Sequence, residues 1–258
     1  MCVFTLSCCL AAFSFFNLNI PEFFQNLSFN LFTQGSVKGV KTANKYTIIL
    51  VGDSMTASLG AGETILPILR EKLPGKELRV LNYGVGSTNI LSLPDKLQIE
   101  LVRSDQTMLP ILSQNFDVII IESFGNNPLA LPLPEALKKS DQALDEAINL
   151  IKKEKPEAVI IFLATIAPNR DNYAKGVEEL SIEERRKWAD ERSAYIQNHI
   201  KYAKSHKIPL INVFDKSLKS ESPNSLVNDS DFIHPSNEGL ELIGSEIANF
   251  LIKKNVLR

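Results

Sequence analysis

Five apolar runs of strand length recur along the chain after residue 45. They are nearly continuous in Val, Ile and Leu, which is typical of strands buried on both faces of a parallel sheet. The five runs span residues 46–51, 78–83, 117–123, 158–164 and 209–214. We therefore predict a five-stranded parallel sheet.

Longer amphipathic stretches lie between these runs and predict helices. The expected helices cover residues 55–73, 88–115, 134–154, 179–206 and 236–254, the second of them broken near Pro94 and Pro110. Strands that alternate with helices form right-handed βαβ units, so the predicted architecture is an α/β fold, a three-layer α/β/α sandwich. Residues 46–258 are expected to form one domain.

Residues 1–45 differ from the rest and form an apolar segment followed by a linker. The first 21 residues contain no charged side chain. Such a segment is typical of a secretory signal or an anchor, although the basic stretch that precedes a signal is missing, and a buried or surface-lying segment is the alternative. Four phenylalanines between residues 20 and 32 could touch a membrane, so the pattern predicts membrane association through residues 1–32. An exported or anchored protein is favoured over a cytoplasmic one.

Charge and cysteine content narrow the class of protein. The chain has 258 residues, with 28 basic and 30 acidic side chains, and its formal net charge is −2. A broad nucleic-acid surface requires clustered Lys and Arg, so no nucleic-acid partner is expected. The three cysteines all lie in the first nine residues, and the sequence offers no Cys/His spacing for zinc. Neither a metal nor an organic cofactor is expected.

The residues after the predicted strands carry the candidate chemistry, because ligands of parallel α/β sheets bind at the carboxyl ends of the strands. Gly52-Asp53-Ser54 follows the first run, and Asp231 and His234 follow the last run. A serine becomes a nucleophile only when a base takes its proton, and imidazole suits neutral water. On a turn, a spacing of three lets Asp231 accept from one imidazole nitrogen while the other faces Ser54. We therefore predict that Ser54, His234 and Asp231 are catalytic.

Other titratable side chains have simpler expected roles. His199 and His206 lie in the charged stretch 179–206, where a solvated helix face is expected for both. Asp53 could be the nucleophile of a metal-dependent phosphoesterase, but the further carboxylates that a metal needs are not evident, so a structural acid in the turn is favoured. Asp229 is a second acid near the candidate histidine, and its spacing of five fits less well.

Candidate donors for an oxyanion follow three of the predicted strands. The backbone N–H of Ser54 lies at the start of a helix. The loop with Gly86 and Ser87 offers further N–H groups, since glycine lets a backbone approach a ligand closely. Asn126 or Asn127 could donate from a side-chain amide. Each of these is also an ordinary turn residue, and only their joint occurrence at successive strand ends favours an oxyanion hole.

These segments resemble the conserved blocks of the SGNH/GDSL hydrolase family, in the family's order and over about residues 46–254. "VGDSMTASLG" resembles the first block, "NYGVGSTN" the second, "ESFGNNPL" the third and "DFIHPSNEGLELIGSEIANFL" the last. The resemblance implies a flavodoxin-like fold and a Ser54 nucleophile whose N–H is also an oxyanion donor. It implies a triad completed by Asp231 and His234.

Two blocks depart from the family's pattern. The glycine that usually lies five residues after the second-block asparagine is replaced by Ser87, so Gly86 or Ser87 could be the donor. The third block usually reads Gly-x-Asn-Asp or similar. The register on Gly125 favours Asn126 as the donor, whereas the Pro-Leu that follows would favour Asn127.

Two further features are expected at the rim of the pocket. Phe124 stands where small residues are frequent in the family and is expected to narrow the acyl side. The segment 165–176 follows the fourth strand, and Arg170, Asn172 or Tyr173 could touch substrate. A surface loop is the alternative for this segment.

The resemblance implies a serine esterase or acylhydrolase that cleaves a small or accessible acyl ester. The family includes lipases, thioesterases, lysophospholipases and carbohydrate O-acetylesterases, so the ester could belong to a small molecule, a glycan or a lipid. If the chain is exported, removal of acetyl groups from an envelope glycan is the more attractive reaction. The alternatives are a non-catalytic glycan- or lipid-binding module on the same fold and an O-acyltransferase.

Overall fold

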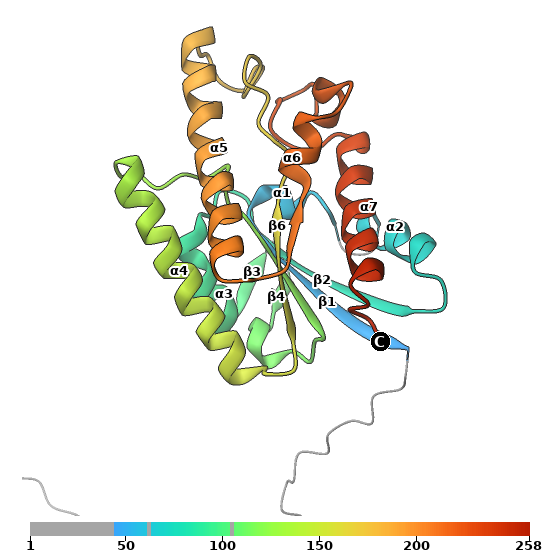
Figure 1. Ribbon diagram of the computed structural model, residues 1–258. Coiled ribbons are helices and arrows are strands. Elements are labelled where there is room, and N and C mark those ends of the chain that lie inside the picture. Colours follow the sequence, from blue (N-terminus) through green and yellow to red (C-terminus); the bar gives the residue numbers. More distant parts are fainter. Residues whose placement is uncertain (1–43, 61–62, 104–105) are drawn as a thin grey trace, which may run out of the picture. The chain divides into compact units, whose positions relative to one another are not determined.

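The computed structural model describes residues 44–60, 63–103 and 106–258, and its centre is a parallel sheet (Figure 1). The sheet order is β2-β1-β5-β6-β7, which is the flavodoxin-like order when only these strands are counted. The strands are β1 (Lys45–Gly52), β2 (Glu77–Gly84), β5 (Val118–Glu122), β6 (Val159–Ala164) and β7 (Leu210–Asn212). The predicted signal or anchor and its membrane contact lie outside the described residues. None of the described helices is long and apolar enough to cross a membrane.

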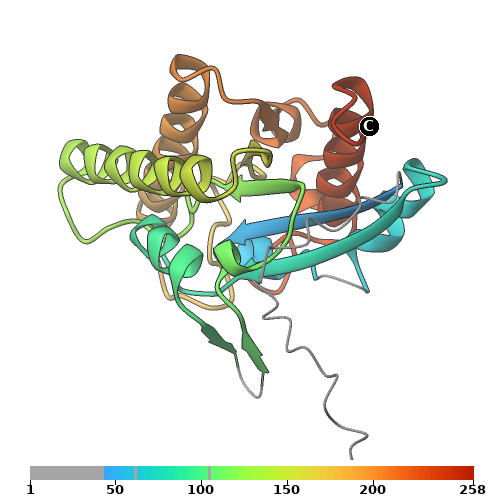
Figure 2. The same ribbon diagram turned by 90° about the horizontal axis from the view of Figure 1, so that it is seen from below.

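Helices cover both faces of the sheet and complete the three-layer sandwich (Figures 1 and 2). Side chains of β1 point alternately to the two faces, so Ile48 and Leu50 enter one core while Ile49 and Val51 enter the other. The first core is covered by α2 (Ile65–Lys72) and α7 (Asn237–Lys253), and the second by α3 (Leu93–Gln98), α4 (Leu133–Glu154) and α5 (Ile182–Ser205). The predicted fold class is confirmed.

The predicted helix over 88–115 is wrong for most of its length. The segment forms η2 (Ile90–Ser92), α3, β3 (Leu101–Arg103), β4 (Gln106–Met108) and η3 (Ile111–Ser113), and β3 pairs with β4 as an antiparallel hairpin. Pro94 lies in the first turn of α3, where its missing N–H is tolerated. Pro110 precedes η3 and separates it from the hairpin.

Two other predicted elements are divided. The stretch 55–73 forms α1 (Ser54–Ala57) and α2, separated by a turn in which Gly60 has a φ of 55°. The run 209–214 ends as a strand at Asn212, because Asn212 Oδ1 accepts the Asp215 N–H at 3.0 Å and thereby starts α6 (Val213–Leu218).

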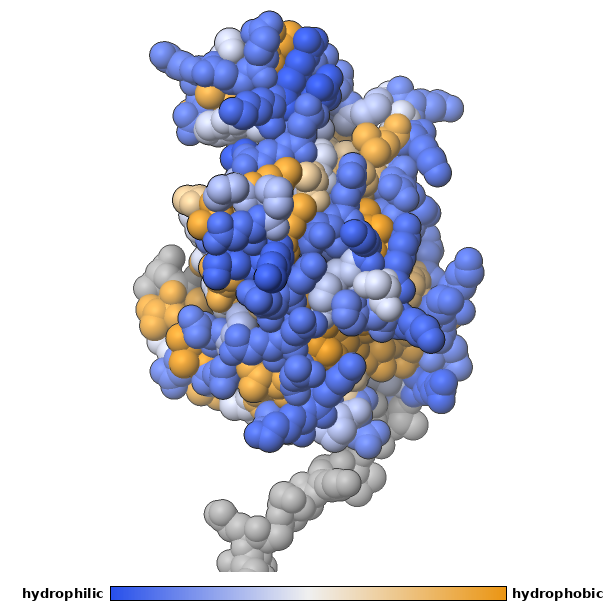
Figure 3. Space-filling model, turned by 60° about the vertical axis from the view of Figure 1, so that its left-hand side comes forward, coloured by the Kyte–Doolittle hydropathy of each residue, from blue (hydrophilic) through white to orange (hydrophobic). Residues whose placement is uncertain are grey.

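Helix α5 confirms the predicted helix over 179–206 but places one histidine differently. His199 is buried, its ring stacks on Phe162 at 4.1 Å, and its Nε2 lies 3.3 Å from the carbonyl oxygen of Ile121. Burial lowers the pKa of His199 to about 3, so the ring is neutral at neutral pH. The prediction of a solvated face is therefore wrong for His199, whereas His206 is exposed. The outer side of α4 and α5 is mostly hydrophilic, with smaller hydrophobic patches (Figure 3).

Candidate active site

Ser54 is the first residue of α1, and one residue, Asp53, separates it from the end of β1 at Gly52. The preceding Asp53 is completely buried, and its Oδ1 accepts the Met55 N–H at 2.8 Å, which caps the helix. Gly52 leaves no room for a side chain, since a Cβ there would lie 2.8 Å from Glu122 Cβ. The glycine and the buried acid together define the turn that presents Ser54.

The loop after β2 is tied to the same turn. Asn82 Nδ2 donates to the carbonyl oxygens of Thr56 and Gly60, at 2.7 and 2.9 Å. Further along, a Cβ on Gly86 would lie 3.8 Å from Ser54 Cβ, so this loop passes beside the candidate nucleophile. Its backbone is therefore close enough to serve a ligand bound at Ser54.

Both departures from the family pattern adopt a left-handed backbone conformation. Ser87 has a φ of 58° and Phe124 a φ of 52°, values that glycine adopts without steric cost. Phe124 is buried in the second core, and Lys96 Nζ lies 5.0 Å from the centroid of its ring. The expectation that Phe124 narrows the acyl pocket is therefore wrong, because the ring packs inside the sandwich.

Asp231 and His234 form a pair in the turn before α7. His234 Nδ1 lies 2.8 Å from Asp231 Oδ2, and Asp231 Oδ1 accepts the backbone N–H groups of Ile233 and His234 at 2.8 and 3.0 Å. Burial opposes ionisation, but the hydrogen bonds from the His234 ring and the two N–H groups outweigh it and lower the pKa of Asp231. The ionised carboxylate fixes the orientation of the ring.

One cavity of about 450 Å³ brings the predicted residues together at the carboxyl ends of the strands. It is lined by Ser54, Gly86, Ser87, Asn126, Asn127 and His234, among others. The site lies where the strand order reverses, between β1 and β5, which is the usual ligand position in such sheets. Asp231 holds His234 in the wall of this cavity.

Asn126 and Asn127 have different partners. Asn127 Nδ2 donates to Asp53 Oδ2 at 2.9 Å, so this amide is tied to the acid of the turn. Asn126 Oδ1 accepts the Tyr173 hydroxyl at 2.9 Å, which leaves the Asn126 NH₂ group for the cavity. This arrangement favours Asn126 over Asn127 as an oxyanion donor.

The loop after β6 reaches the cavity through Tyr173. The other two candidates in this loop point elsewhere. Arg170 pairs with Asp190 at 2.7 Å on the exposed surface, and the side-chain amide of Asn172 donates to Asn169 Oδ1 at 3.4 Å. Neither Arg170 nor Asn172 lines the cavity.

Trp188 and Arg192 of α5 also line the cavity, and neither is predicted from the sequence. The Arg192 guanidinium carbon lies 4.7 Å from the Trp188 ring centroid and 5.5 Å from that of Tyr173, and Nη1 lies 2.8 Å from Glu191 Oε2. A spacing of four places Trp188 and Arg192 on one helix face. That signal is present in the sequence but is obscured by the many charges of the stretch.

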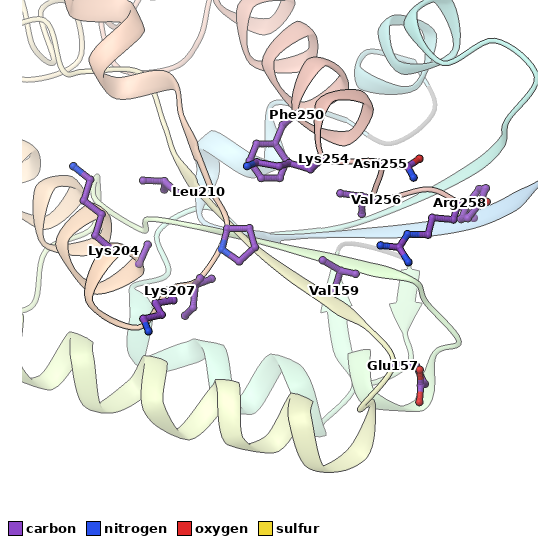
Figure 4. Close-up of a pocket in the computed structure, with 14 residues that line it drawn as sticks. Glu157, Val159, Lys204, Lys207, Leu210, Phe250, Lys254, Asn255, Val256 and Arg258 are labelled. Atoms are coloured by element: carbon purple, nitrogen blue, oxygen red, sulfur yellow. The ribbon is translucent and has the colours of Figure 1, made fainter.

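A larger cavity of about 930 Å³ lies at the amino ends of the strands, on the side of the sheet away from Ser54 (Figure 4). Its lining includes Val159 and Phe250, together with Lys204, Lys207 and Lys254. It contains none of the predicted site residues. Across the described ranges, no group of three or more His, Cys, Asp or Glu side chains could hold a metal ion.

A serine at a strand-to-helix turn, in one cavity with an imidazole that a carboxylate holds, is the arrangement of serine hydrolases. The GDSL-like Lipase/Acylhydrolase family model matches residues 50–242, and the chain belongs to this family. It is accordingly an enzyme of the carboxylic ester hydrolase class.

Several solved structures share the fold. The lipase/acylhydrolase from Enterococcus faecalis is 14% identical, with a TM-score of 0.58 over 81% of this chain and 96% of that chain. An acetyl xylan esterase is 15% identical, with a TM-score of 0.56 over 79% and 98% of the two chains. An acetylxylan esterase from Geobacillus stearothermophilus is 18% identical, with a TM-score of 0.51 over 82% and 96%. A search of curated proteins gave no match. At these identities the likeness establishes the fold alone.

Proposed function

We propose that this enzyme hydrolyses a small acyl ester with Ser54, His234 and Asp231 as its catalytic triad. The observation that carries the proposal is the 2.8 Å contact between His234 Nδ1 and Asp231 Oδ2, in the wall of the cavity that Ser54 also lines. Ser54 Oγ attacks the acyl carbon while His234 takes its proton. Asp231 accepts from the ring and stabilises the imidazolium that forms.

Donors from three strand ends stabilise the negatively charged oxygen of the tetrahedral intermediate. These are the Ser54 N–H, the loop of Gly86 and Ser87, and the Asn126 amide, all of which line the cavity. The intermediate collapses as His234 returns the proton to the leaving alcohol. A water molecule then attacks the acyl-enzyme by the same sequence of proton transfers.

An O-acetylated carbohydrate is the substrate class that we favour. A cavity of about 450 Å³ lies within the usual range for small-ligand sites. Trp188 in its wall offers an aromatic face against which a sugar ring can pack. Two solved structures with this fold are acetyl xylan esterases by name. A lipid ester, as cleaved by lysophospholipases, is the competing substrate.

Hydrolysis of p-nitrophenyl acetate by wild type and matched variants tests the triad. Ser54→Ala and His234→Ala are expected to lose at least about 10³-fold in kcat/KM, as triad variants do. Ser113→Ala and His206→Ala remove the same side chains from exposed positions and are expected to retain wild-type activity. Equal rates for wild type and Ser54→Ala would overturn the proposal and favour a non-catalytic binding module.

The acyl group and the acceptor are tested separately. Acetate, butyrate and octanoate esters of p-nitrophenol are compared, followed by acetylated xylo-oligosaccharides. A preference for acetate and release of acetate from the oligosaccharide are expected, whereas a preference for octanoate would favour a lipid substrate. Adding a sugar acceptor separates the transferase alternative, because acyl transfer would divert product from acetate to the acylated sugar.

A further inference from the structure

Two buried carboxyl groups lie directly beneath the Ser54 turn. Asp53 follows the last residue of β1, and Glu122 is the last residue of the neighbouring strand β5. Their exposed fractions are 0% and 1%. They lie at adjacent strand ends, because β1 pairs with β5 and a Cβ on Gly52, the residue before Asp53, would lie 2.8 Å from Glu122 Cβ. Two carboxylates in contact away from water repel each other strongly, so a proton between them stabilises the arrangement.

The partners of Asp53 suit the ionised member of the pair. Its Oδ1 accepts the Met55 N–H at 2.8 Å, and its Oδ2 accepts Asn127 Nδ2 at 2.9 Å. Burial raises the pKa of Asp53, while these donors and the charge of Lys96 oppose the rise. Lys96 is itself buried, and its Nζ donates to the carbonyl oxygen of Gly52 at 2.7 Å.

For Glu122, burial and the charge of Asp53 favour the protonated form and outweigh the donors that favour the ionised form. Those donors are the Ser123 hydroxyl, which lies 2.6 Å from Glu122 Oε1, and the Phe124 N–H, which lies 3.0 Å from Oε2. Burial, followed by the negative charge of Asp53, raises the pKa of Glu122 well above its usual range. Of the two acids, Glu122 is the one that retains its proton.

The charged and titratable groups around the pair come from α3, α5 and the loop after β6. Tyr173 of that loop has a pKa raised to about 12, by burial first and in part by the charge of Asp53, so its phenol is neutral. Lys96 of α3 contributes one positive charge. His199 of α5 contacts the carbonyl of Ile121, next to Glu122, and its pKa of about 3 leaves it neutral. With one shared proton, the pair carries −1 and Lys96 +1, so the cluster is neutral. Without that proton, the cluster would carry −1 in the interior, which is unfavourable.

We propose that Glu122 is a positioning residue, which shares one proton with Asp53 and thereby fixes the Ser54 turn relative to the Asn127 loop. The Asp53 carboxylate accepts a hydrogen bond from each segment. The Met55 N–H donates from the Ser54 turn, and Asn127 Nδ2 donates from the loop after β5. Loss of the shared proton would drive the two carboxylates apart and displace Asp53 from these donors. The kinetic consequence rests on the proposed function, whereas the shared proton does not.

The kinetic test is the pH profile of kcat for p-nitrophenyl acetate. A triad alone loses activity toward acid pH, where the imidazole is protonated. We expect wild type to lose activity toward alkaline pH also, as the pair is deprotonated. Glu122→Gln donates an N–H to Asp53 at every pH, so it is expected to keep kcat within about threefold at pH 7 and to lack the alkaline loss. An alkaline loss unchanged in Glu122→Gln would overturn the proposal.

Glu122→Ala tests whether Glu122 acts on the catalytic step, measured by kcat, or on substrate binding, measured by KM. The substitution removes the shared proton while Met55 and Asn127 still donate to Asp53, so kcat is expected to fall at least about tenfold while KM stays near the wild-type value. Recovery of kcat in Glu122→Gln, which has the same shape as the native residue, completes the comparison. Equal loss of kcat in both variants at neutral pH would overturn the role of the donor.

Infrared spectroscopy tests the proton without any turnover, in the Ser54→Ala background. A protonated carboxylic acid has a C=O stretching band that a carboxylate lacks. We expect this band at pH 7 in Ser54→Ala, its loss in Ser54→Ala/Glu122→Gln, and its retention when the exposed Glu146→Gln is the second change. Absence of the band from Ser54→Ala would overturn the shared proton even in an active esterase. A band in a protein without esterase activity would overturn the proposed function alone.

Discussion

The hydroxyl of Tyr173 donates a hydrogen bond to Asn126 Oδ1 at 2.9 Å. Tyr173 follows β6 and Asn126 follows β5, so the contact joins loops from neighbouring strands. Burial raises the pKa of Tyr173 to about 12, so the phenol keeps its proton and remains a donor across neutral pH. Because Tyr173 holds the oxygen, the amide nitrogen of Asn126 has a defined direction.

Tyr173→Phe removes this donor and lets the Asn126 amide rotate. We expect kcat for p-nitrophenyl acetate to fall about tenfold with little change in KM, because a misoriented oxyanion donor costs less than a deleted one. The control is Tyr195→Phe, whose hydroxyl accepts the Leu129 N–H away from the cavity and whose loss is expected to leave kcat unchanged. A wild-type kcat in Tyr173→Phe would contradict the role of this contact.

Ser87 and Lys207 share a left-handed backbone, with φ values of 58° and 55°. Lys207 follows α5 at the position where glycine commonly ends a helix. Replacing either residue by glycine is expected to raise the free energy of unfolding by about 0.5–1 kcal/mol, measured by urea denaturation, because a side chain disfavours this conformation.

The two glycine variants differ in their expected effect on activity. Ser87 lines the cavity that contains Ser54 and His234, whereas Lys207 lies outside that cavity. Only Ser87→Gly is therefore expected to change kcat/KM. A parallel change in both variants would indicate a general effect on the fold rather than one on the cavity.

Gly52→Ala tests the close packing of the Ser54 turn. The added methyl group would lie 2.8 Å from Glu122 Cβ, so we expect a loss of about 2–3 kcal/mol in the free energy of unfolding, together with most of the activity. Gly86→Ala is the matched variant, since its methyl would lie at an ordinary 3.8 Å from Ser54 Cβ. It is expected to keep its stability and raise KM. Thermal denaturation and steady-state kinetics measure both, and wild-type stability in Gly52→Ala would refute the packing argument.

His199 makes stability depend on pH. Its pKa of about 3 in the folded protein lies below the ~6.5 of an exposed histidine, so the unfolded chain takes up the proton first and stability is lost as pH falls below about 6.5. His199 alone is expected to remove about 2 kcal/mol of unfolding free energy between pH 7 and pH 5. His199→Phe retains a ring against Phe162 and should reduce the pH dependence by that amount, as measured by urea denaturation.

The exposed His206→Phe serves as the control for His199. It removes a histidine from the same helix end without a buried environment, so the full pH dependence is expected to persist. A pH dependence in His199→Phe equal to that of wild type would mean that other groups cause it.

The sheet could be predicted because strands buried on both faces leave uninterrupted apolar runs, such as 78–83 for β2. The same topology rule explains why Ser54 and His234, far apart in sequence, could be placed in one cavity. Their catalytic roles stay predictions. Helix 88–115 was wrong because short elements with prolines and a hairpin carry no sustained period.

The contacts beneath the site could not be predicted. Lys96 lies in a short polar stretch that resembles a solvated helix, yet it is buried against Gly52 and the Asp53 pair. Glu122 is simply the last residue of an apolar run. Burial of such charges depends on which strands become neighbours, and that information is tertiary rather than local. His199 shows the same effect, because its burial comes from packing against Phe162 of β6 and not from the sequence around it.

Strand β7 is short and pairs only with Phe162–Ala164 of β6. The earlier part of β6, which begins at Val159, therefore has a hydrogen-bonding edge that β7 does not cover, and the larger cavity opens there (Figure 4). Such an edge is a template on which a second chain can add a strand. Lys204, Lys207 and Lys254 surround it, so two copies approaching edge to edge would bring like charges together. The lysines at this end of the sheet are therefore expected to disfavour pairing of β6 with a second chain.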